Sequence, residues 1–319
     1  MKRLNLIALI MSSLLCAASQ GLNAAGFATR ELNPMLQPLF LPSLLPFGAE
    51  NGWRIDHSLF VTNDFQKRDR GNESLIIDVE NYRYELDLSH RNDKWLTHVN
   101  IPLMANRDGE LDGTIEDWHD FFGLPEGKRP DYPRDQVNIE YRRDGVVEYS
   151  QTEASEGLGD IAISVGYQPT GATAYFAGIE LPTGSASDFS GNEAIDIAFW
   201  LTHEARINAA ANAYGMLGIS FPGDDGNLEG LTADHIWAAQ LGIDYRFWDD
   251  FVATAQLDMH TGAIDGSALR AFEESYQILL GLGFLRLFDN HRLDLFFTED
   301  ILVRSAPDIT FGLRLAREF

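Results

Sequence analysis

The chain ends in the stretch DITFGLRLAREF, residues 308–319, and this stretch decides the fold class. Apolar side chains occupy its alternate positions and its last residue is aromatic: Ile309, Phe311, Leu313, Leu315 and Phe319. A spacing of two places these side chains on one face of a β-strand, with the mostly polar residues between them on the other. The sequence therefore predicts an amphipathic strand that runs to the C-terminal carboxylate.

A last strand of this kind is typical of bacterial outer-membrane barrels. In such barrels the final strand closes the sheet and the outer-membrane assembly machinery reads its end, so we expect that machinery to be a partner of this strand. Arg317 departs from the pattern, because an apolar or aromatic residue usually stands there. The alternative is the last strand of a soluble sandwich.

The N-terminus predicts export. Lys2 and Arg3 precede an apolar run over residues 4–15, and small residues follow it, so residues 1–25 have the layout of a cleaved secretory signal peptide. The apolar run is too short for a membrane-spanning helix. Cys16 is the only cysteine, and it follows two leucines instead of the small residue that a lipoprotein signal needs. We therefore expect a mature chain without cysteine, as suits an oxidising compartment.

Hydropathy and charge limit the fold and the partners. The mean hydropathy is −0.17, and after residues 1–25 no stretch of sequence could span a bilayer as a helix. A transmembrane barrel has such a composition, because lipid-facing apolar residues alternate with lumen-facing polar ones. The net charge of −24 makes nucleic acid a poor partner. It also suggests divalent cations or basic ligands at the loops, although acidity mainly affects solubility.

From residue 53 onward, alternating apolar residues predict about twelve amphipathic strands. The predicted strands cover residues 53–65, 74–89, 94–104, 159–168, 173–181, 194–204, 208–221, 235–247, 251–260, 275–287, 291–298 and 308–319. The connections between them are alternately short and long. Outer-membrane barrels have short periplasmic turns and longer extracellular loops, and an even strand number leaves both termini in the periplasm.

The predicted fold class is therefore all-β, a transmembrane antiparallel up-and-down β-barrel of about twelve strands over residues 53–319. We expect it in the outer membrane of a Gram-negative bacterium, in contact with outer-membrane lipid and lipopolysaccharide. Aromatic residues near the short-turn ends fit an interfacial girdle, although aromatic residues are common in strands generally. They are Trp53, Trp95, Tyr167, Tyr175, Tyr245, Trp248 and Phe319.

Two segments do not follow the strand pattern. Residues 26–52 are apolar and interrupted by prolines, so they are neither a regular strand nor a helix. A periplasmic tail would expose their Leu and Phe side chains to water, and a plug inside the lumen is the favoured alternative. The second segment is a long extracellular loop over residues 105–158, in which we expect a short helix at 114–122 and a hairpin at 137–149. A structured loop of this length usually has a function.

Some motifs resemble those of known families. The stretch GLGD at 157–160, which runs into IAISVGYQ, and ELPTG at 180–184 resemble outer-membrane proteins of the phenol meta-pathway type. Those proteins are thought to be channels for hydrophobic compounds, broadly like long-chain fatty-acid channels. The stretches WHDFFGLPEGKR at 118–129 and FTEDILVRSAPDITFGLRLAREF at 297–319 resemble an outer-membrane family known as a domain of unknown function. The resemblance covers most of the mature chain and implies a location more than an activity.

No residue pattern predicts an enzyme, a cofactor site or a metal site. His57–Ser58 and Ser89–His90 are adjacent pairs whose side chains point to opposite faces of a strand, so neither pair can act together. Metal-binding Cys/His spacing and a phosphate-binding loop are absent from the sequence. Residues 225, 227 and 229 alternate like calcium ligands, but the motif is incomplete and a solvated acidic turn is the stronger interpretation.

Polar residues opposite the apolar faces are expected to line the lumen, where they either form ion pairs that stiffen the barrel or filter solutes. Asp160, Glu180 and Asp196 fall on neighbouring strands near the extracellular end. We expect arginines of the long loop to pair with this acidic cluster and hold a constriction, with a bound calcium ion as the alternative. The arginines are Arg129, Arg134, Arg142 and Arg143. Further lumen candidates are Arg246, Asp258, His260 and Arg314.

Two functions fit these patterns. The first is a channel or diffusion conduit for small solutes, hydrophobic ones among them. The second is a structural or interaction barrel whose extracellular loops bind surface polysaccharide, a partner protein or divalent cations. An open lumen would favour the first function and a solidly packed lumen the second.

Overall fold

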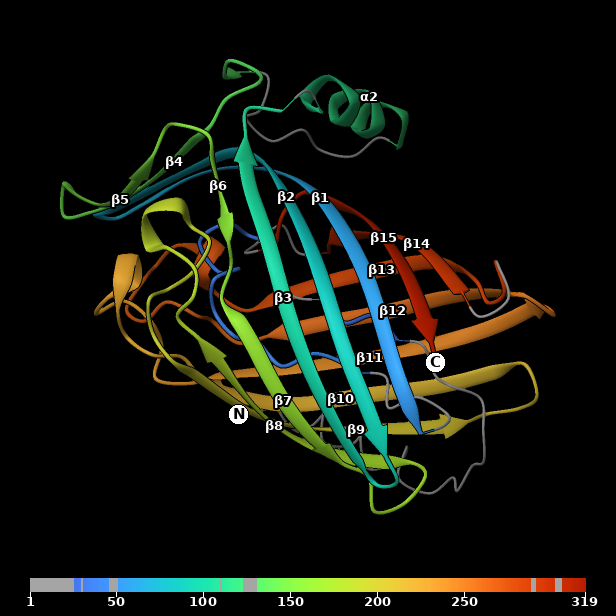
Figure 1. The fold of residues 1–319 in the computed structure, drawn as a ribbon. Helices are drawn as coiled ribbons and strands as arrows, with labels where there is room; N and C mark the ends of the chain where they lie inside the picture. The colour runs from blue at the N-terminus through green and yellow to red at the C-terminus, as the bar shows by residue number, and fades with distance from the viewer. Residues whose placement is uncertain are drawn as a thin grey trace, which may run out of the picture.

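The computed structural model describes residues 26–29, 31–45, 51–109, 111–122, 131–287, 291–301 and 306–319. Twelve of its strands form a closed antiparallel barrel, in which strands adjacent in sequence order lie side by side (Figure 1). They are β1 (Gly52–Arg70), β2 (Glu73–Asn92), β3 (Trp95–Arg107), β7 (Ile161–Tyr167), β8 (Thr173–Leu181), β9 (Asp196–Arg206), β10 (Ala211–Phe221), β11 (Ile236–Trp248), β12 (Phe251–His260), β13 (Ser275–Phe284), β14 (His291–Asp300) and β15 (Ile309–Glu318). The predicted fold class is confirmed. None of the described helices is long and apolar enough to cross a membrane.

The C-terminal strand closes the barrel. β15 pairs with β1 in a continuous register from Arg54↔Glu318 to Asn63↔Ile309. The backbones of Trp53 and Phe319 extend the ladder, since each donates a hydrogen bond to the other's carbonyl oxygen at 3.3 and 2.9 Å. A Cβ atom on Gly52 would lie 2.2 Å from the carbonyl oxygen of Phe319, and the φ angle of Gly52 is +147°. Glycine is therefore required where the first strand meets the chain end.

The outer surface of the wall carries the apolar residues that alternation predicts. Large apolar side chains such as Ile195, Phe199 and Leu282 are about half exposed, which is unusual for residues of this size. The aromatic residues near the short-turn ends also point outward: Trp53, Trp95, Tyr167, Tyr175, Tyr245, Trp248 and Phe319. The rings of Trp95 and Tyr167, on the neighbouring strands β3 and β7, lie 4.8 Å apart. An apolar band edged by aromatic rings matches the surface of a lipid-embedded barrel.

The first hairpin, formed by β1 and β2, is longer than the sequence predicts. The sequence predicts a long loop at 66–73, whereas β1 and β2 stay paired as far as Arg70↔Glu73 and turn through Gly71 and Asn72. Residues 66–70 of β1 are polar, so the apolar alternation that marks a wall strand ends before β1 does. The extension pairs with the hairpin of β4 (Asn138–Arg143) and β5 (Val146–Gln151), through β2 and β4. The hairpin was predicted from Arg143-Asp144-Gly145, and Asp144 and Gly145 have φ angles of +53° and +78°, as a two-residue turn of type I′ needs.

Loops and the hairpin cover the barrel end that carries the long connections. Helix α2 (Asp112–Phe122) follows β3, and β6 (Ser155–Leu158) pairs with the end of β3. Short 3-10 turns occupy Ala186–Asp188, Gly226–Leu228 and Arg270–Phe272 in three other loops. Buried apolar residues from these parts form one cluster, the loop cap: Leu75, Ile77, Val79, Val137, Ile139, Tyr141, Tyr149, Phe189, Leu228, Leu231, Ala233, Ile236, Ala263, Ile264, Leu269, Ala271 and Phe272. The cap gives this end of the barrel a hydrophobic core of its own.

Residues 26–29 and 31–45, here called the lumen segment, lie inside the barrel (Figure 1, blue coil). They form no strand or helix, only turns between Pro34 and Leu39. Almost all of their side chains are buried, and the tip of the segment contacts the loop cap through Met35, Leu36 and Leu39. The sequence left open whether this segment is a free tail or lies in the lumen, and its burial places its described part in the lumen. The predicted signal at residues 1–25 lies outside the described residues.

Candidate functional site

The lumen segment is attached to the wall by hydrogen bonds from inward-facing side chains. The amide of Gln256, on β12, accepts from the backbone nitrogen of Phe27 and donates to its carbonyl oxygen, both at 3.0 Å. The amide of Gln240, on β11, accepts from the nitrogen of Leu44 at 2.6 Å and donates to the carbonyl oxygen of Thr29 at 3.1 Å. Two glutamine side chains therefore replace strand partners for the backbone of the segment, which satisfies polar groups that would otherwise be buried alone.

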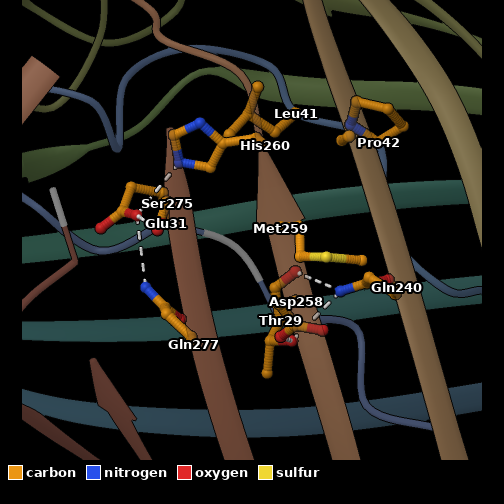
Figure 2. Close-up of a pocket in the computed structure, with 11 residues that line it drawn as sticks. Thr29, Glu31, Leu41, Pro42, Gln240, Asp258, Met259, His260, Ser275 and Gln277 are labelled. Atoms are coloured by element: carbon orange, nitrogen blue, oxygen red, sulfur yellow. Dashed lines mark hydrogen bonds and ion pairs between the residues drawn. The ribbon is translucent and has the colours of Figure 1, made fainter. Parts of the chain in front are cut away.

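A second group of contacts surrounds Glu31 (Figure 2). Its carboxylate is completely buried and accepts hydrogen bonds from the hydroxyl of Ser275 at 2.8 Å and the amide of Gln277 at 3.3 Å. Nε2 of His260 lies 3.1 Å from the same oxygen. Nδ1 of His260 lies 2.7 Å from the carbonyl oxygen of Thr261, which can only accept, so Nδ1 carries a proton. A hydrogen bond between Nε2 and the Glu31 carboxylate then needs a further proton on one of the two groups. Through this contact His260 of the wall holds Glu31 of the lumen segment.

Asp258 lies beside this group on β12, and Figure 2 shows it facing Thr29 and Gln240. Its carboxylate accepts hydrogen bonds from the hydroxyl of Thr29 and, at 2.8 Å, from the amide of Gln256. His260 and Asp258, both candidates from the sequence, are therefore contacts of the lumen segment. The sequence did not single out Glu31, Gln240 or Gln256, because neutral amides at inward positions look like ordinary lumen lining.

The middle of the lumen is apolar. Phe40, Leu44 and Leu45 of the segment pack against apolar wall residues: Leu96, Ala162, Ala174, Phe176, Ala198, Trp200, Tyr214, Met216 and Ala238. The ring of Trp200 stacks on Phe176 with centroids 5.1 Å apart and meets Phe40 edge-on at 6.3 Å. A Cβ atom on Gly178 would lie 2.9 Å from the Phe40 ring, so the absence of a side chain at this position makes room for the ring. The segment fills an apolar chamber between two polar ends.

The short-turn end of the lumen is held by buried ion pairs. The Asp294 carboxylate is fully buried between two guanidinium groups, with Nε of Arg292 at 2.8 Å and NH2 of Arg314 at 2.9 Å. The guanidinium of Arg314 also lies 4.6 Å above the ring of Phe27 and donates to the carbonyl oxygen of Gly26 at 3.4 Å. The candidate Arg314 therefore links the wall to the start of the segment. Arg246, another candidate, lies half-buried near the turn between β11 and β12.

The acidic cluster at the other end is brought together as the sequence predicts, with Glu180 paired to Asp196 across β8 and β9. Most of the hydrogen bonds to Asp160 and Asp196 come from backbone groups, and Asp196 also accepts from the side-chain amide of Asn192 at 2.9 Å. Asp160 accepts from the nitrogen atoms of Gly184 at 2.7 Å and Asn192 at 2.9 Å. Asp196 accepts from Phe40 at 2.9 Å and Gly223 at 2.8 Å, and Phe40 belongs to the lumen segment. These carboxylates organise two loops and the segment, as a charged acceptor does when it collects backbone N–H donors.

The expected pairing of loop arginines with this cluster is wrong for the described residues. Arg134 pairs with Glu116 of α2, and Arg142 lies 2.6 Å from Glu140. Nε of Arg143 donates to the hydroxyl of Tyr141 at 2.9 Å and lies close to Glu73. Burial and the neighbouring Glu73 carboxylate raise the pKa of the Tyr141 phenol to about 12. Arg129 lies outside the described residues.

The physical reason is local. β4 pairs with the extension of β2, so Arg142 and Arg143 project from a sheet above the mouth and meet carboxylates on that same sheet. Backbone donors from the β8–β9 loop already surround Asp160. Within the part of the chain that the structure describes, no three His, Cys, Asp or Glu side chains are grouped as a metal site would need.

Replacing Asp160 by Asn is expected to loosen the loop over residues 182–195. The amide has one acceptor oxygen, and its NH2 group would face the backbone donors, so about 2 kcal/mol of local stability should be lost. Hydrogen exchange at the amides of Gly184 and Asn192 should become faster. The control is Asp234→Asn, which alters an exposed carboxylate in the loop after β10. Unchanged exchange at both amides would show that the carboxylate does not hold the loop.

The sequence matches, over residues 6–319, the family described as protein of unknown function (DUF3187). The chain belongs to this family. No curated protein matches the DUF3187 chain in sequence. Among solved structures, the COG4313 outer membrane channel from Pseudomonas putida F1 has a TM-score of 0.57 and 15% identity, covering 89% of this chain and 98% of the channel.

Two further structures are more distant from the DUF3187 chain. The CymD monoaromatic hydrocarbon channel has a TM-score of 0.45 and 10% identity, over 93% of this chain and 94% of its own. The Pseudomonas putida toluene transporter TodX has a TM-score of 0.41 and 10% identity, over 93% and 95%. At 15% identity the likeness to the COG4313 channel establishes the barrel fold, and the residues of the lumen must be interpreted from their own contacts.

Proposed function

We propose that this DUF3187 protein is an outer-membrane channel for small, largely apolar solutes, and that its lumen segment closes it at rest. The outward apolar band with its aromatic edge supports a place in the lipid bilayer. The observation that carries the proposal is the way in which the segment is attached. Its backbone bonds to wall side chains such as Gln240, Gln256 and Asp196, and takes no part in the strand ladders.

Such a segment can leave without opening the wall. All twelve barrel strands keep their ladder partners when the segment moves, because the ring from β1 to β15 is complete without it. Removal of a wall strand would expose two rows of unpaired backbone groups inside the membrane, which is prohibitive. The segment is therefore the part of the lumen that can move at the lowest cost.

The chemistry of the lumen supports apolar solutes. The chamber around Phe176, Trp200 and Met216 is lined mainly by apolar side chains, with polar ones on its β2–β3 side, and the segment fills it with Phe40, Leu44 and Leu45. An apolar solute that entered the chamber would recover much of the burial lost by these side chains, at about 25 cal/mol per Å². Gln37, at the tip of the segment, is buried with both amide atoms lacking a hydrogen-bond partner among the described residues, which destabilises the closed arrangement.

A second function is favoured by one observation. The cavities beside the segment have volumes of about 20 Å³ each, enough for a water molecule but not for a solute. A lumen that stays packed would suit a structural or interaction barrel that acts through its loops. Solute flux separates the two functions: liposomes containing the channel should admit small apolar solutes faster than empty liposomes, whereas a permanently packed barrel should leave the rate unchanged.

The membrane location can be tested on its own. We expect the protein to fractionate with the outer membrane and to migrate faster in gels before boiling than after it, because a closed barrel stays folded in cold detergent. The strand ladder that joins β1 to β15 is the feature that gives this resistance. Recovery of the protein in the soluble periplasmic fraction, with no change on boiling, would contradict both the location and the proposed channel.

A further inference from the structure

One small cavity between the lumen segment and the wall combines polar atoms with aromatic packing. Its wall side is formed by Asp87 of β2, His98 and Asn100 of β3, and Trp200 of β9. Phe40 and Leu45 of the segment form its apolar side. The polar side chains of His98, Asn100 and Trp200 are all at least nine-tenths buried.

Asp87 fixes the two β3 side chains. Its Oδ1 atom lies 2.9 Å from Nε2 of His98 and accepts a hydrogen bond from the Asn100 amide nitrogen at 2.8 Å. A carboxylate only accepts, so the proton of a neutral His98 ring is on Nε2 and Nδ1 is left as an acceptor. The amide of Asn100 is likewise oriented with its nitrogen toward Asp87, which leaves its oxygen directed elsewhere. The His98 ring and the Asn100 amide are thus both positioned by one carboxylate.

Three polar atoms around the cavity have no hydrogen-bond partner among the described residues. They are Nδ1 of His98, Oδ1 of Asn100 and Nε1 of Trp200. Two of them accept and one donates. Buried polar atoms are rarely left without partners, since each costs about 1–3 kcal/mol. A hydroxyl group can pair two of the three atoms, because it donates to one of the acceptors and accepts from the indole nitrogen of Trp200.

We propose that His98, Asn100 and Trp200 form a binding site for a small uncharged solute that carries a hydroxyl group on an apolar or aromatic body. This inference rests on the proposed channel function and names its solute class. The solute body takes the place of Phe40 and Leu45 when the segment withdraws, beside the stacked rings of Trp200 and Phe176. Anions are disfavoured, because the carboxylates of Glu85 and Asp87 also line the cavity.

Cations find no strong site there. Asp87 is occupied by His98 and Asn100, and Glu85 is paired with Arg83 at 2.6 Å. With anions and cations both disfavoured, the site can still discriminate between uncharged solutes that carry a hydroxyl group and those that do not. A site built to hydrogen-bond a hydroxyl discriminates against the analogue that lacks it, because the protein groups are then left buried and unpaired.

The test compares 4-ethylphenol with ethylbenzene, which differ only in the hydroxyl group. Binding to the full chain in detergent micelles is measured by calorimetry and corrected for partition into empty micelles. We expect the phenol to bind at least about tenfold more tightly, which corresponds to one or two net hydrogen bonds. Trp200→Phe, which keeps the aromatic stack, and His98→Leu should each reduce this preference several-fold, measured as the ratio of the two affinities within each variant. His203→Leu, a control on the outward-facing side of β9 and not in this cavity, should keep the preference.

Equal affinity of the wild-type chain for both compounds, or a preference that survives in both variants, would overturn the site and leave the cavity with an ordered water only. Heat-modifiable migration shows which variants have assembled, and Trp200→Phe keeps the test valid if His98→Leu does not assemble. Flux of both compounds into liposomes is measured in parallel. Flux no faster than that into empty liposomes would contradict the channel, whereas faster flux of both compounds without a binding preference would contradict only this site.

Discussion

Deletion of residues 31–45 is expected to turn a closed barrel into a conducting one. In planar bilayers the full chain should show little conductance, and the deletion variant should show resolvable single-channel steps. The reason is that the described segment fills the space between the loop cap and the ion pairs around Arg314, while the wall is closed without it. A twelve-stranded wall encloses more space than its own side chains fill, since eight strands already suffice for a filled interior.

A point variant tests the same idea with less disturbance. Phe40→Asp places a carboxylate in the apolar chamber beside Trp200, where an unpaired charge cannot remain without a large desolvation cost. The segment should be expelled and conductance should rise toward that of the deletion variant. The matched control is Phe121→Asp, because Phe121 of α2 is 81% exposed and lies outside the lumen. Equal, low conductance of the full chain, the deletion and Phe40→Asp, all correctly assembled, would favour the structural or interaction barrel.

The sequence predicted the wall because a period of two is a local signal that survives in every strand. The strands predicted at 173–181 and 251–260 coincide with β8 and β12. The C-terminal limit of β1 was wrong, because beyond the apolar band this strand continues in polar residues and is held by pairing with β2, which in turn pairs with β4. The alternation of apolar residues shows which part of a strand faces lipid. It does not show where the backbone pairing between strands ends.

The polar contacts were harder to predict, for two different reasons. Glu140 stands two residues before Arg142 on the same face of one strand, so the sequence could have predicted this ion pair. We expected instead a long-range pair between Arg142 and the acidic cluster. The partners of Asp160 were not readable, because they are backbone N–H groups whose direction depends on the folded loop at 182–195. The contacts of Glu31 join residues more than 220 positions apart and follow no pattern in sequence.

Replacing Asp294 by Asn is expected to give the largest loss of barrel stability among single carboxylate changes. Asp294 is fully buried and neutralises the guanidinium groups of Arg292 and Arg314, which are themselves almost completely buried. The neutral amide removes the carboxylate that both guanidinium groups contact, and breaking a buried ion pair in this way costs about 3–5 kcal/mol. Urea unfolding of the barrel in detergent, followed by tryptophan fluorescence, should show a lower midpoint with an unchanged slope.

The control is the same chemical change at an exposed ion pair. Asp250 and Arg286 lie 2.5 Å apart on the short-turn side, with both side chains substantially exposed, so Asp250→Asn should shift the midpoint far less. The Asp294 variant should also weaken the hold on the lumen segment, because Arg314 contacts Gly26 and Phe27 and loses the carboxylate that orients it. Raised conductance together with lowered stability would show that the ion pairs of the wall and the closure of the lumen are coupled. If the two carboxylate variants unfold at the same urea concentration, the buried pairs contribute no more than a surface pair and this account of the short-turn end is incorrect.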